Sequence, residues 1–311
     1  MKGADIMQKQ KSNKTKNRRA RKEALTARLC LLPSMIGLIF LTYIPLIAVF
    51  ILGFFKWKGI SKPSFIGFGN YIRMFTADPY FKDSIWVTVV FSVIAVAGSM
   101  LYSLFIAILL NRKIPARGFF RAVFYLPYVL PAAAVYIGWS WLYETNFGLF
   151  NYILKSLGIQ NVLFLVDSKY VLPSIALISI WLSGNLIVIF LAGLQNVPRV
   201  YHEAAEIDGA NGFQRFLYVT LPSMSPIIFY NLLMSLISNM QVITPAMALT
   251  NGGPGTSSTF ISYLMYRYAF KDNQIGYACA VSFIFFIIIA VFTGLVFSFS
   301  GKWVFYEGGE Q

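Results

Sequence analysis

The stretch VYHEAAEIDGANGFQRFLYVTLP occupies residues 200–222 and lies between two long apolar segments. Proline is favoured at the start of a helix, so Pro198 can open a short helix here. The carboxylates of Glu203 and Glu206 suit the positive amino-terminal end of that helix. Gly209 can end it, because glycine adopts backbone angles that other residues avoid. The first half of the stretch therefore predicts one short surface helix followed by a break.

The second half of the stretch predicts another short helix at the membrane surface. Gly212 completes the break between the two helices. Phe213, Phe216 and Leu217 follow at i, i+3 and i+4 spacing, so they form one apolar stripe on a helix. Pro222 is expected to stop this helix.

The composition of the chain is that of a membrane protein. Of the 311 residues, 57% are hydrophobic and only 12% are charged, whereas soluble domains carry about 25% charged residues. The net charge of +14 could suggest a nucleic-acid binder, but ten of the 26 Lys and Arg residues lie within residues 1–28. The apolar run behind this basic arm, residues 29–55, is too long for a signal-peptide core. We expect a retained anchor, contact of the arm with anionic membrane lipid, and no nucleic-acid partner.

Six windows of the sequence are long enough to cross the hydrocarbon core, which takes about 20 apolar residues in a helix. A helix satisfies every backbone amide within its own segment, so we expect an all-α, polytopic membrane protein with six transmembrane helices. No window contains Asp, Glu or Lys, and Arg121 lies at the edge of one of them. The windows are residues 29–55, 84–110, 119–143, 171–194, 223–249 and 275–299.

The distribution of Lys and Arg orients these windows, because basic residues near span ends stay on the cytoplasmic side. With the amino terminus inside, the inside segments carry 17 of these residues and the outside segments carry nine. Both termini and the connection 195–222 are then cytoplasmic. The first outside connection, residues 56–83, runs against this trend with five bases. The predicted divisions are a basic cytoplasmic arm (1–28), a six-helix membrane domain (29–299) and a cytoplasmic tail (300–311).

Prolines within the windows predict helix distortions. Proline removes a backbone hydrogen bond and kinks a helix, which membrane proteins tolerate beside a neighbouring helix or a cavity. Pro45 and Pro245 are interpreted as ordinary distortions. Pro127 and Pro131 lie one turn apart, and the aromatic residues near them are Tyr125, Tyr128, Trp139 and Trp141. We therefore expect the third span to be bent near a cavity.

The chain lacks the groups that would let it drive transport alone. Ion-coupled pumps usually place carboxylates, His or Lys inside the membrane, and the six windows have none. A phosphate-binding loop is also absent, because the Gly-Lys pair at Gly301 is followed by Trp303 instead of Ser or Thr. His202 is interpreted as a solvated loop residue, and Cys30 and Cys279 lie in apolar runs without metal or disulfide spacing. We expect no enzyme activity, cofactor or metal in this chain, and an external source of energy.

Residues 203–222 resemble the signature loop of the membrane subunits of binding-protein-dependent ABC importers. That pattern reads Glu-Ala-Ala, three residues, Gly, nine residues, Ile, one residue, Leu-Pro. This sequence matches it except at Val219, which replaces Ile conservatively. The resemblance implies that the helix carrying Glu203 docks in a cleft of an ATPase and transmits the closure of that ATPase. The coupling residues that it implies are Glu203, Ala204, Ala205, Asp208, Gly209, Leu221 and Pro222.

The resemblance covers nearly the whole chain and is closest to the carbohydrate-importing branch, the maltose-type and glycerol-phosphate-type permeases. Further matching stretches are FIGFGNY (65–71), NRK (111–113), FFRA (119–122), LP (126–127) and TNGGPG (250–255). The resemblance implies a type I ABC importer transmembrane domain in the cytoplasmic membrane of a bacterium. It also implies a second homologous permease subunit, two cytoplasmic ATPases that bind the ATP and Mg, an external solute-binding protein, and an oligosaccharide or other carbohydrate as substrate.

A sugar site needs hydrogen-bonding side chains and flat aromatic faces that converge near the middle of the membrane. Ser235, Ser238 and Asn239 in the fifth window share one helical face at i, i+3 and i+4. Trp181 and Asn185 in the fourth window form an i, i+4 pair, with a stacking surface beside an amide. We predict that these residues bind the substrate. The alternative is that they join helices through hydrogen bonds worth about 0.6 kcal/mol each.

The sequence leaves two functional alternatives open. The chain could be a membrane sensor or scaffold that uses the same fold and loop to recruit a regulator. Its substrate could also be a non-sugar polar solute of the glycerol-phosphate type. The intact loop and the polar faces within the spans favour transport of a carbohydrate, but they do not name the sugar.

Overall fold

The computed structural model describes residues 23–305, so most of the basic arm and the end of the tail lie outside the described residues. Three helices in this part of the chain are long and apolar enough to cross a membrane: Glu23–Leu52, α4 (Pro79–Asn111) and α15 (Ile275–Ser300). Three further helix pairs pass the same test together but are bent at a short break. With each bent pair counted as one span, the described chain has the six spans that the sequence predicts.

Helices make up nearly all of the regular structure between residues 23 and 305. The bent pairs are α5 (Arg117–Val129) with α6 (Ala132–Leu142), α8 (Val171–Trp181) with α9 (Gly184–Asn196), and the helix Gly212–Ser223 with α13 (Ser225–Met240), and their bends are 98°, 48° and 67°. The helix Glu23–Leu52 includes η1 (Ile39–Tyr43) and α2 (Ile44–Leu52), and the helix Gly212–Ser223 consists of α11 (Gly212–Arg215), η2 (Phe216–Thr220) and α12 (Leu221–Ser223). The remaining elements are β1 (Phe55–Lys56), β2 (Ser64–Phe65), α3 (Gly69–Thr76), α7 (Leu149–Ser156), α10 (Arg199–Ile207), η3 (Ala246–Thr250), α14 (Ile261–Tyr266) and η4 (Arg267–Lys271).

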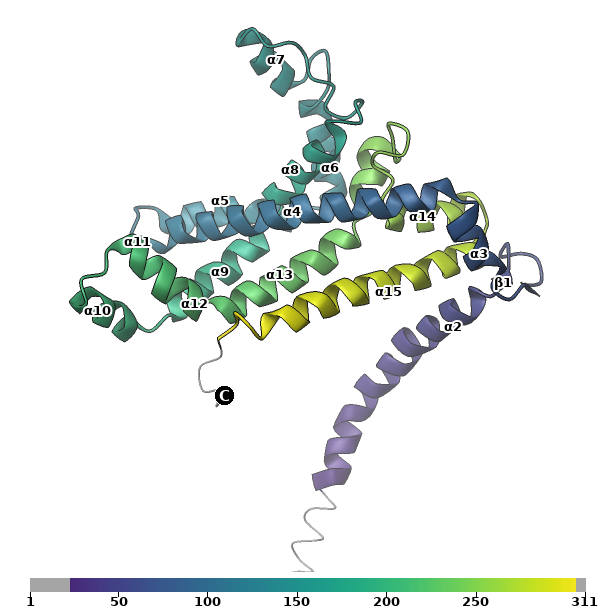
Figure 1. Cartoon of the computed structure of the whole chain (residues 1–311), viewed down its shortest axis with the longest axis horizontal. Helices are drawn as coiled ribbons and strands as arrows, with labels where there is room; N and C mark the ends of the chain where they lie inside the picture. Colours follow the sequence, from purple (N-terminus) through teal and green to yellow (C-terminus); the bar gives the residue numbers. More distant parts are fainter. Residues whose placement is uncertain (1–22, 306–311) are drawn as a thin grey trace, which may run out of the picture.

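Figure 1 shows α4, α13 and α15 running side by side, with α5 and α9 alongside α4. The short helices α10, α11 and α12 lie at one end of this bundle, and α3, β1 and α14 lie at the other end. The helices α6 and α8 lead away from the bundle toward an arm that carries α7. The C-terminal part of the helix Glu23–Leu52 packs on α15, where the ring centroids of Phe50 and Phe283 are 4.6 Å apart, and the rest of this helix diverges from the bundle.

Small hydroxyl side chains let α4 pack closely against its neighbours. Five of them are at most 2% exposed, namely Ser84, Thr88, Ser92, Ser99 and Ser103. The Ser103 Oγ lies 2.9 Å from the Oγ of Ser183, which sits at the break between α8 and α9. The Thr88 Oγ1 accepts the backbone N–H of Ile261 at the start of α14, at 3.0 Å. Through these contacts α4 connects the broken fourth span to the far end of the bundle.

The bend in the third span lies at the two prolines that predict it. The helix α5 ends at Val129 and α6 begins at Ala132, and the two meet at 98°. Leu130 has extended backbone angles (φ −68°, ψ 146°), because a residue before proline is pushed out of the helical region. Pro127 is buried within α5, and Pro131 precedes the first residue of α6. The prediction of a bent third span is confirmed.

The fifth window, residues 223–249, is wrong as a single continuous helix. The helix α13 ends at Met240, and the chain is helical again from residue 244, directly before η3. The ring of Pro245 would clash with the carbonyl of Gln241, four residues earlier, if the helix continued. Apolar composition runs through this break, so hydropathy alone does not reveal it. The span also begins earlier than predicted, with the bent segment that starts at residue 212.

A buried carboxylate holds together the end of the bundle opposite α10. Asp78 is 6% exposed and accepts the backbone N–H of Phe81 at 3.3 Å, which caps the start of α4. Its Oδ2 also accepts the hydroxyls of Tyr268 and Tyr277, each at 2.6 Å. Burial raises the pKa of Tyr268, so that hydroxyl stays neutral and donates to the carboxylate. Asp78 therefore connects α4 to η4 and to the start of α15.

Candidate functional site

The helices α10 and α11 form the two short helices that residues 200–222 predict. Pro198 precedes α10, and Gly209 follows it with φ of 80°. Asn211 caps α11, since its side chain accepts the backbone N–H of Gln214 at 2.9 Å. The Gln214 side chain in turn accepts the backbone N–H of Asn211 at 2.8 Å, which completes a capping box. The break predicted from the glycines is therefore a left-handed turn followed by a capped helix start.

The predicted placement of the two acids at the positive end of α10 is wrong. Glu203 is the fifth residue of this helix, and its first turn contains no acid. The helix dipole acts mainly within the first and last turns, so it does not explain these side chains. Glu206 lies near the end of α10 and pairs with Arg215 of α11, with Oε2 and Nη1 2.8 Å apart. This ion pair connects the two helices, while Glu203 stays exposed.

Pro222 does not stop the second helix, contrary to the prediction. The helix continues from Gly212 to Ser223, and the π-helical turn η2 directly precedes Leu221. In a regular helix a proline clashes with the carbonyl four residues earlier, and a widened turn relieves that clash. The helix ends only at Ser223, beside Met224, where the chain bends by 67° into α13.

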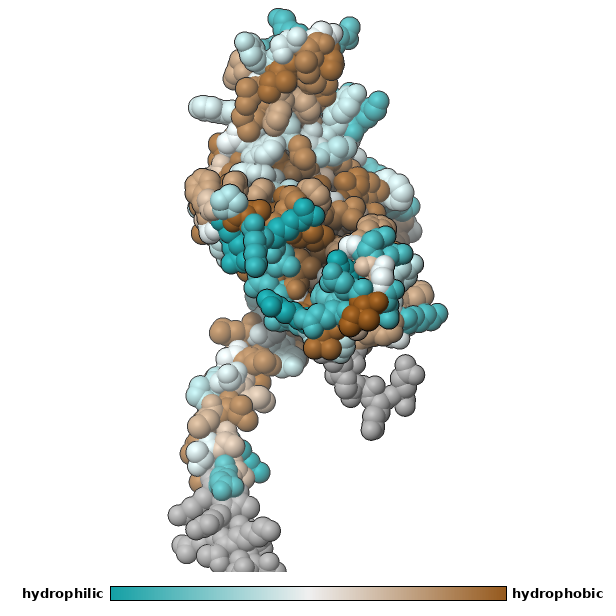
Figure 2. All heavy atoms as spheres, turned by 90° about the vertical axis from the view of Figure 1, so that its left-hand side faces the viewer, coloured by the Kyte–Doolittle hydropathy of each residue, from teal (hydrophilic) through white to brown (hydrophobic). Residues whose placement is uncertain are grey.

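We call the exposed residues Val200, Glu203, Ile207, Asp208 and Phe213, which lie on the two helices and in the turn between them, the docking face. Its three apolar side chains, Val200, Ile207 and Phe213, are 68%, 87% and 72% exposed. Glu203 and Asp208 add exposed carboxylates beside them. Figure 2 views the end of the molecule where these helices lie, and there hydrophobic side chains stand among hydrophilic ones. Large exposed apolar side chains rimmed by polar groups are typical of a protein interaction site.

A second feature is a cavity of 340 Å³ at the breaks in the spans. It lies where the break at Leu130, the break at Leu182 and the end of α13 meet. Fifteen residues line it, and none of them is charged. The polar residues among them are Ser99, Tyr128, Tyr136, Ser179, Ser183, Asn185, Ser235, Ser238 and Asn239. The cavity therefore offers hydroxyl, amide and aromatic groups without a formal charge.

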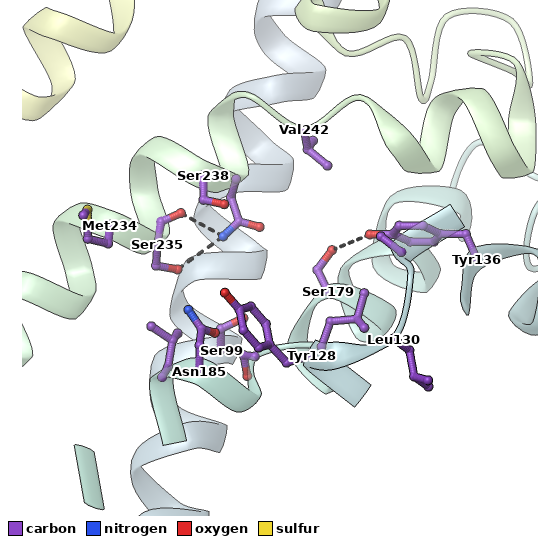
Figure 3. A pocket seen from close by; sticks show the side chains of 15 residues that line it. Ser99, Tyr128, Leu130, Tyr136, Ser179, Asn185, Met234, Ser235, Ser238 and Val242 are labelled. Carbon is purple, nitrogen blue, oxygen red and sulfur yellow. Dashed lines mark hydrogen bonds between the residues drawn. The ribbon is translucent and has the colours of Figure 1, made fainter. Parts of the chain in front are cut away.

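Four of the five predicted substrate residues line this cavity together. They are Asn185 of α9 and Ser235, Ser238 and Asn239 of α13. Figure 3 shows Ser235 and Ser238 on one side of a common space, with Asn185 of α9 and Tyr128 of α5 facing it. Trp181 lies outside it, because the break between α8 and α9 interrupts the helical spacing that would place it beside Asn185. Its ring instead packs against Trp139, with centroids 5.6 Å apart.

The hydrogen bonds within the cavity leave several polar groups available. The Asn239 amide donates to the Ser235 carbonyl at 2.8 Å and to its Oγ at 3.2 Å, so it is satisfied within its own helix. Tyr136 and Ser179 lie with their hydroxyl oxygens 3.5 Å apart. Asn185 and Ser238 donate no side-chain hydrogen bond to any other described residue. The contacts of Asn185, Ser235, Ser238 and Asn239 therefore do not show the alternative role of joining helices.

The sequence reasoning missed five polar residues of the cavity wall. Ser99 belongs to the buried hydroxyl stripe of α4, and its regular spacing was the available signal. Tyr128 stands beside the two prolines that predict a cavity, although it was not assigned to the substrate. Tyr136, Ser179 and Ser183 come together only because two spans break. No pattern along the sequence indicates that meeting.

These features define a class of protein. A chain with six candidate membrane spans, an uncharged polar cavity at their breaks and an exposed docking face at one end is typical of a membrane transport subunit. The family model of the binding-protein-dependent transport system inner membrane component matches residues 99–305, and the chain belongs to that family.

Individual relatives cover almost the whole chain. The probable ABC transporter permease protein YesP of Bacillus subtilis (strain 168) is 36% identical over 99% of each chain. The trehalose/maltose transport system permease protein MalF of Thermococcus litoralis is 31% identical and covers 88% of this chain and 92% of its own length. The solved structure of a bacterial ABC transporter involved in the import of the acidic polysaccharide alginate matches with a TM-score of 0.77, at 22% identity, over 91% of this chain and 98% of that chain. The predicted family and the six-span importer fold are confirmed.

Proposed function

We propose that this chain is a permease subunit of an ATP-driven importer that moves a neutral carbohydrate, in particular an oligosaccharide, by alternating access. The observation that carries the proposal is the uncharged polar cavity at the breaks of the spans. Sugars are recognised by hydroxyl and amide hydrogen bonds together with aromatic faces, and the cavity has all three kinds of group. A relative that is named for trehalose and maltose supports the same substrate class.

The cavity disfavours a glycerol-phosphate-type solute. A phosphate removed from water needs cations or several strong donors, because an unpaired buried charge is costly. Neither Lys, Arg nor His lines the cavity in the part of the chain that the structure describes. A polyol has no such requirement, since its hydroxyls can exchange hydrogen bonds with Asn185, Ser238 and Tyr128.

The source of energy would be a partner that docks on the docking face. The docking face is connected to the cavity, because the Glu206–Arg215 ion pair joins α10 to the helix Gly212–Ser223, which bends directly into α13. A rigid movement of α10 would therefore pull on the helix that carries Ser235, Ser238 and Asn239. ATP and Mg would be bound by two ATPase subunits and not by this chain.

Further partners follow from surfaces that this chain leaves open. The helix Glu23–Leu52 is exposed from residue 23 to residue 47 apart from Gly37, which suits contact with lipid and with a second homologous permease subunit. We place α10 and both termini in the cytoplasm and α7 on the outer side of a bacterial cytoplasmic membrane, where an external solute-binding protein would deliver the sugar. This orientation rests on the distribution of Lys and Arg.

The competing function is a sensor or scaffold that recruits a regulator through the docking face. Reconstitution of this chain into vesicles with its partner permease, the ATPases and the binding protein separates the two. We expect loaded binding protein to stimulate ATP hydrolysis and labelled oligosaccharide to accumulate in the vesicles. If ATP hydrolysis is not stimulated and no oligosaccharide accumulates, the sensor or scaffold function is favoured.

The substrate site has its own test. We expect Asn239→Ala and Asn185→Ala to raise the KM for uptake while the complex assembles normally, because each removes a polar group from the cavity wall. Ser156→Ala, on the exposed face of the outer arm, is the matched control. Unchanged uptake kinetics in both asparagine variants would remove these residues from the site.

A further inference from the structure

We propose that the groove between α4, α5 and α9, near the docking face, binds the phosphate of an anionic membrane phospholipid. The groove has a volume of 200 Å³. It is lined by Leu110, Arg121, Tyr125, Ile187, Val188, Leu191, Ala192 and Gln195. Arg117, one turn before Arg121 on α5, lies at its polar end. This site is separate from the substrate cavity and shares none of its lining residues.

The two arginines are held together by neutral groups. With its amide oxygen turned toward them, Gln195 accepts hydrogen bonds from the Nη2 atoms of Arg121 at 2.9 Å and Arg117 at 3.1 Å. The Arg117 Nε donates to the carbonyl of Leu110 at 2.5 Å, which fixes that guanidinium. The Arg121 Nε is buried and has no hydrogen-bond partner among the described residues. A fixed pair of guanidinium groups with a spare buried donor is a strong binding site for phosphate oxygens.

No carboxylate neutralises this pair in the part of the chain that the structure describes. The ion pairs there are Glu206 with Arg215 and Arg267 with Asp272. The connection 111–118, which leads into α5, contains no Asp or Glu. Two half-buried cations without a counter-ion repel each other, so an anion that joins them is stabilising.

The groove changes from polar to apolar along the direction that a lipid would take. Gln195 and Val188 are two turns apart on α9, which corresponds to about 10 Å along the helix. Tyr125 lies one turn after Arg121 on α5, and Ile187 and Leu191 of α9 line the apolar part of the groove. Val188 is 48% exposed, so this apolar end opens sideways to the surface of the bundle. A phosphate at the arginines with an acyl chain along Val188 matches this order, whereas free phosphate or a protein carboxylate would use only the polar end.

Lipid binding can be measured on the assembled importer without any transport. Native mass spectrometry of the complex in detergent would follow titration with phosphatidylglycerol, phosphatidylcholine and inorganic phosphate in separate arms. We expect preferential binding of phosphatidylglycerol, and about tenfold weaker binding in Arg121→Gln, because a hydrogen bond to a charged group is lost. Arg121→Lys should show an intermediate loss, and Arg112→Gln, an exposed arginine on the same connection, should bind normally.

Val188→Trp tests the apolar half of the groove while keeping both arginines. We expect it to weaken phosphatidylglycerol binding without changing the thermal unfolding of the complex. The proposal is overturned if Arg112→Gln weakens lipid binding as much as Arg121→Gln, or if inorganic phosphate binds as tightly as the lipid. It is also overturned if Arg121→Gln separates the permease subunits at unchanged lipid binding, since the arginines would then meet a carboxylate of the partner. None of these outcomes depends on which solute the importer carries.

Discussion

Replacing Gly209 by alanine isolates the energy of the turn between α10 and α11. Gly209 has φ of 80°, and a Cβ placed on it would meet no atom within 4 Å. The substitution therefore adds backbone strain without a steric clash. Left-handed backbone costs a residue with a side chain about 1–2 kcal/mol. That strain acts against the loop geometry that holds α10 in its docking orientation.

The expected effect is a weaker complex with the ATPase. Because 1–2 kcal/mol corresponds to about 5–30-fold in an equilibrium constant, Gly209→Ala should raise the Kd for the ATPase by about that factor. Gly209→Asn should lose less, since asparagine tolerates the left-handed region better than alanine. Gly212→Ala is the matched control, because a Cβ there also meets no atom within 4 Å and its φ is not positive.

The assay is titration of the purified ATPase into the membrane complex in nanodiscs, with ATP hydrolysis recorded in parallel. We expect Gly212→Ala to bind as the wild type does and Gly209→Ala to bind more weakly. Equal binding by the wild type and Gly209→Ala, or an equal loss in Gly212→Ala, would show that strain at this turn does not control docking.

Three other perturbations test different parts of the structure. Asp78→Ala should destabilise the complex by about 2–5 kcal/mol, because it leaves two buried tyrosine hydroxyls without an acceptor. Thermal unfolding measures this loss. A loss no larger than that caused by Asp83→Ala, at an exposed position, would contradict it. Trp181→Ala should cost about 3 kcal/mol of stability, since its ring packs on that of Trp139. It should leave the KM for the sugar unchanged, and a changed KM would show that Trp181 contributes to the substrate site. The backbone N–H of Phe147, followed by the amide groups of Asn146, lowers the pKa of Glu144 below its usual value of 4.5. The turn before α7 should therefore have its full stability well above that pH and lose it progressively as the pH falls toward and through the lowered pKa. Hydrogen exchange of this turn checks the sign, and a turn whose stability rises as the pH falls would contradict it.

The apolar composition of long sequence windows predicts the spans well, and individual prolines predict some of the breaks within them. Apolar windows without Asp, Glu or Lys mark the positions of all six spans, because a membrane helix has no alternative way to satisfy its backbone. Pro127 and Pro131 indicate the 98° bend directly, since proline excludes the helical conformation before it. The break after Met240 is less visible, because Pro245 acts on a carbonyl four residues earlier while the composition stays apolar.

Helical spacing predicts neighbours only where the helix is continuous. Ser235, Ser238 and Asn239 share the cavity because α13 is regular through them. Trp181 and Asn185 have the same type of spacing, but the break at Leu182 places the ring in a separate apolar cluster. The ion pair of Glu206 with Arg215 likewise depends on how the chain turns at Gly209. The spacing of residues in the sequence does not predict the angle between the two helices at this turn.

In the proposed importer, ATP acts through α10 and changes which side of the membrane the cavity faces. Ser238 lines the cavity and is exposed, so a cysteine placed there in a variant that lacks Cys30 and Cys279 reports access from outside. An impermeant maleimide should label Ser238→Cys slowly at rest and much faster when loaded binding protein and ATP are present, while Ser156→Cys on the outer arm labels equally in both states. A labelling rate at position 238 that does not change with ATP and binding protein would show that the cavity does not alternate between the two sides.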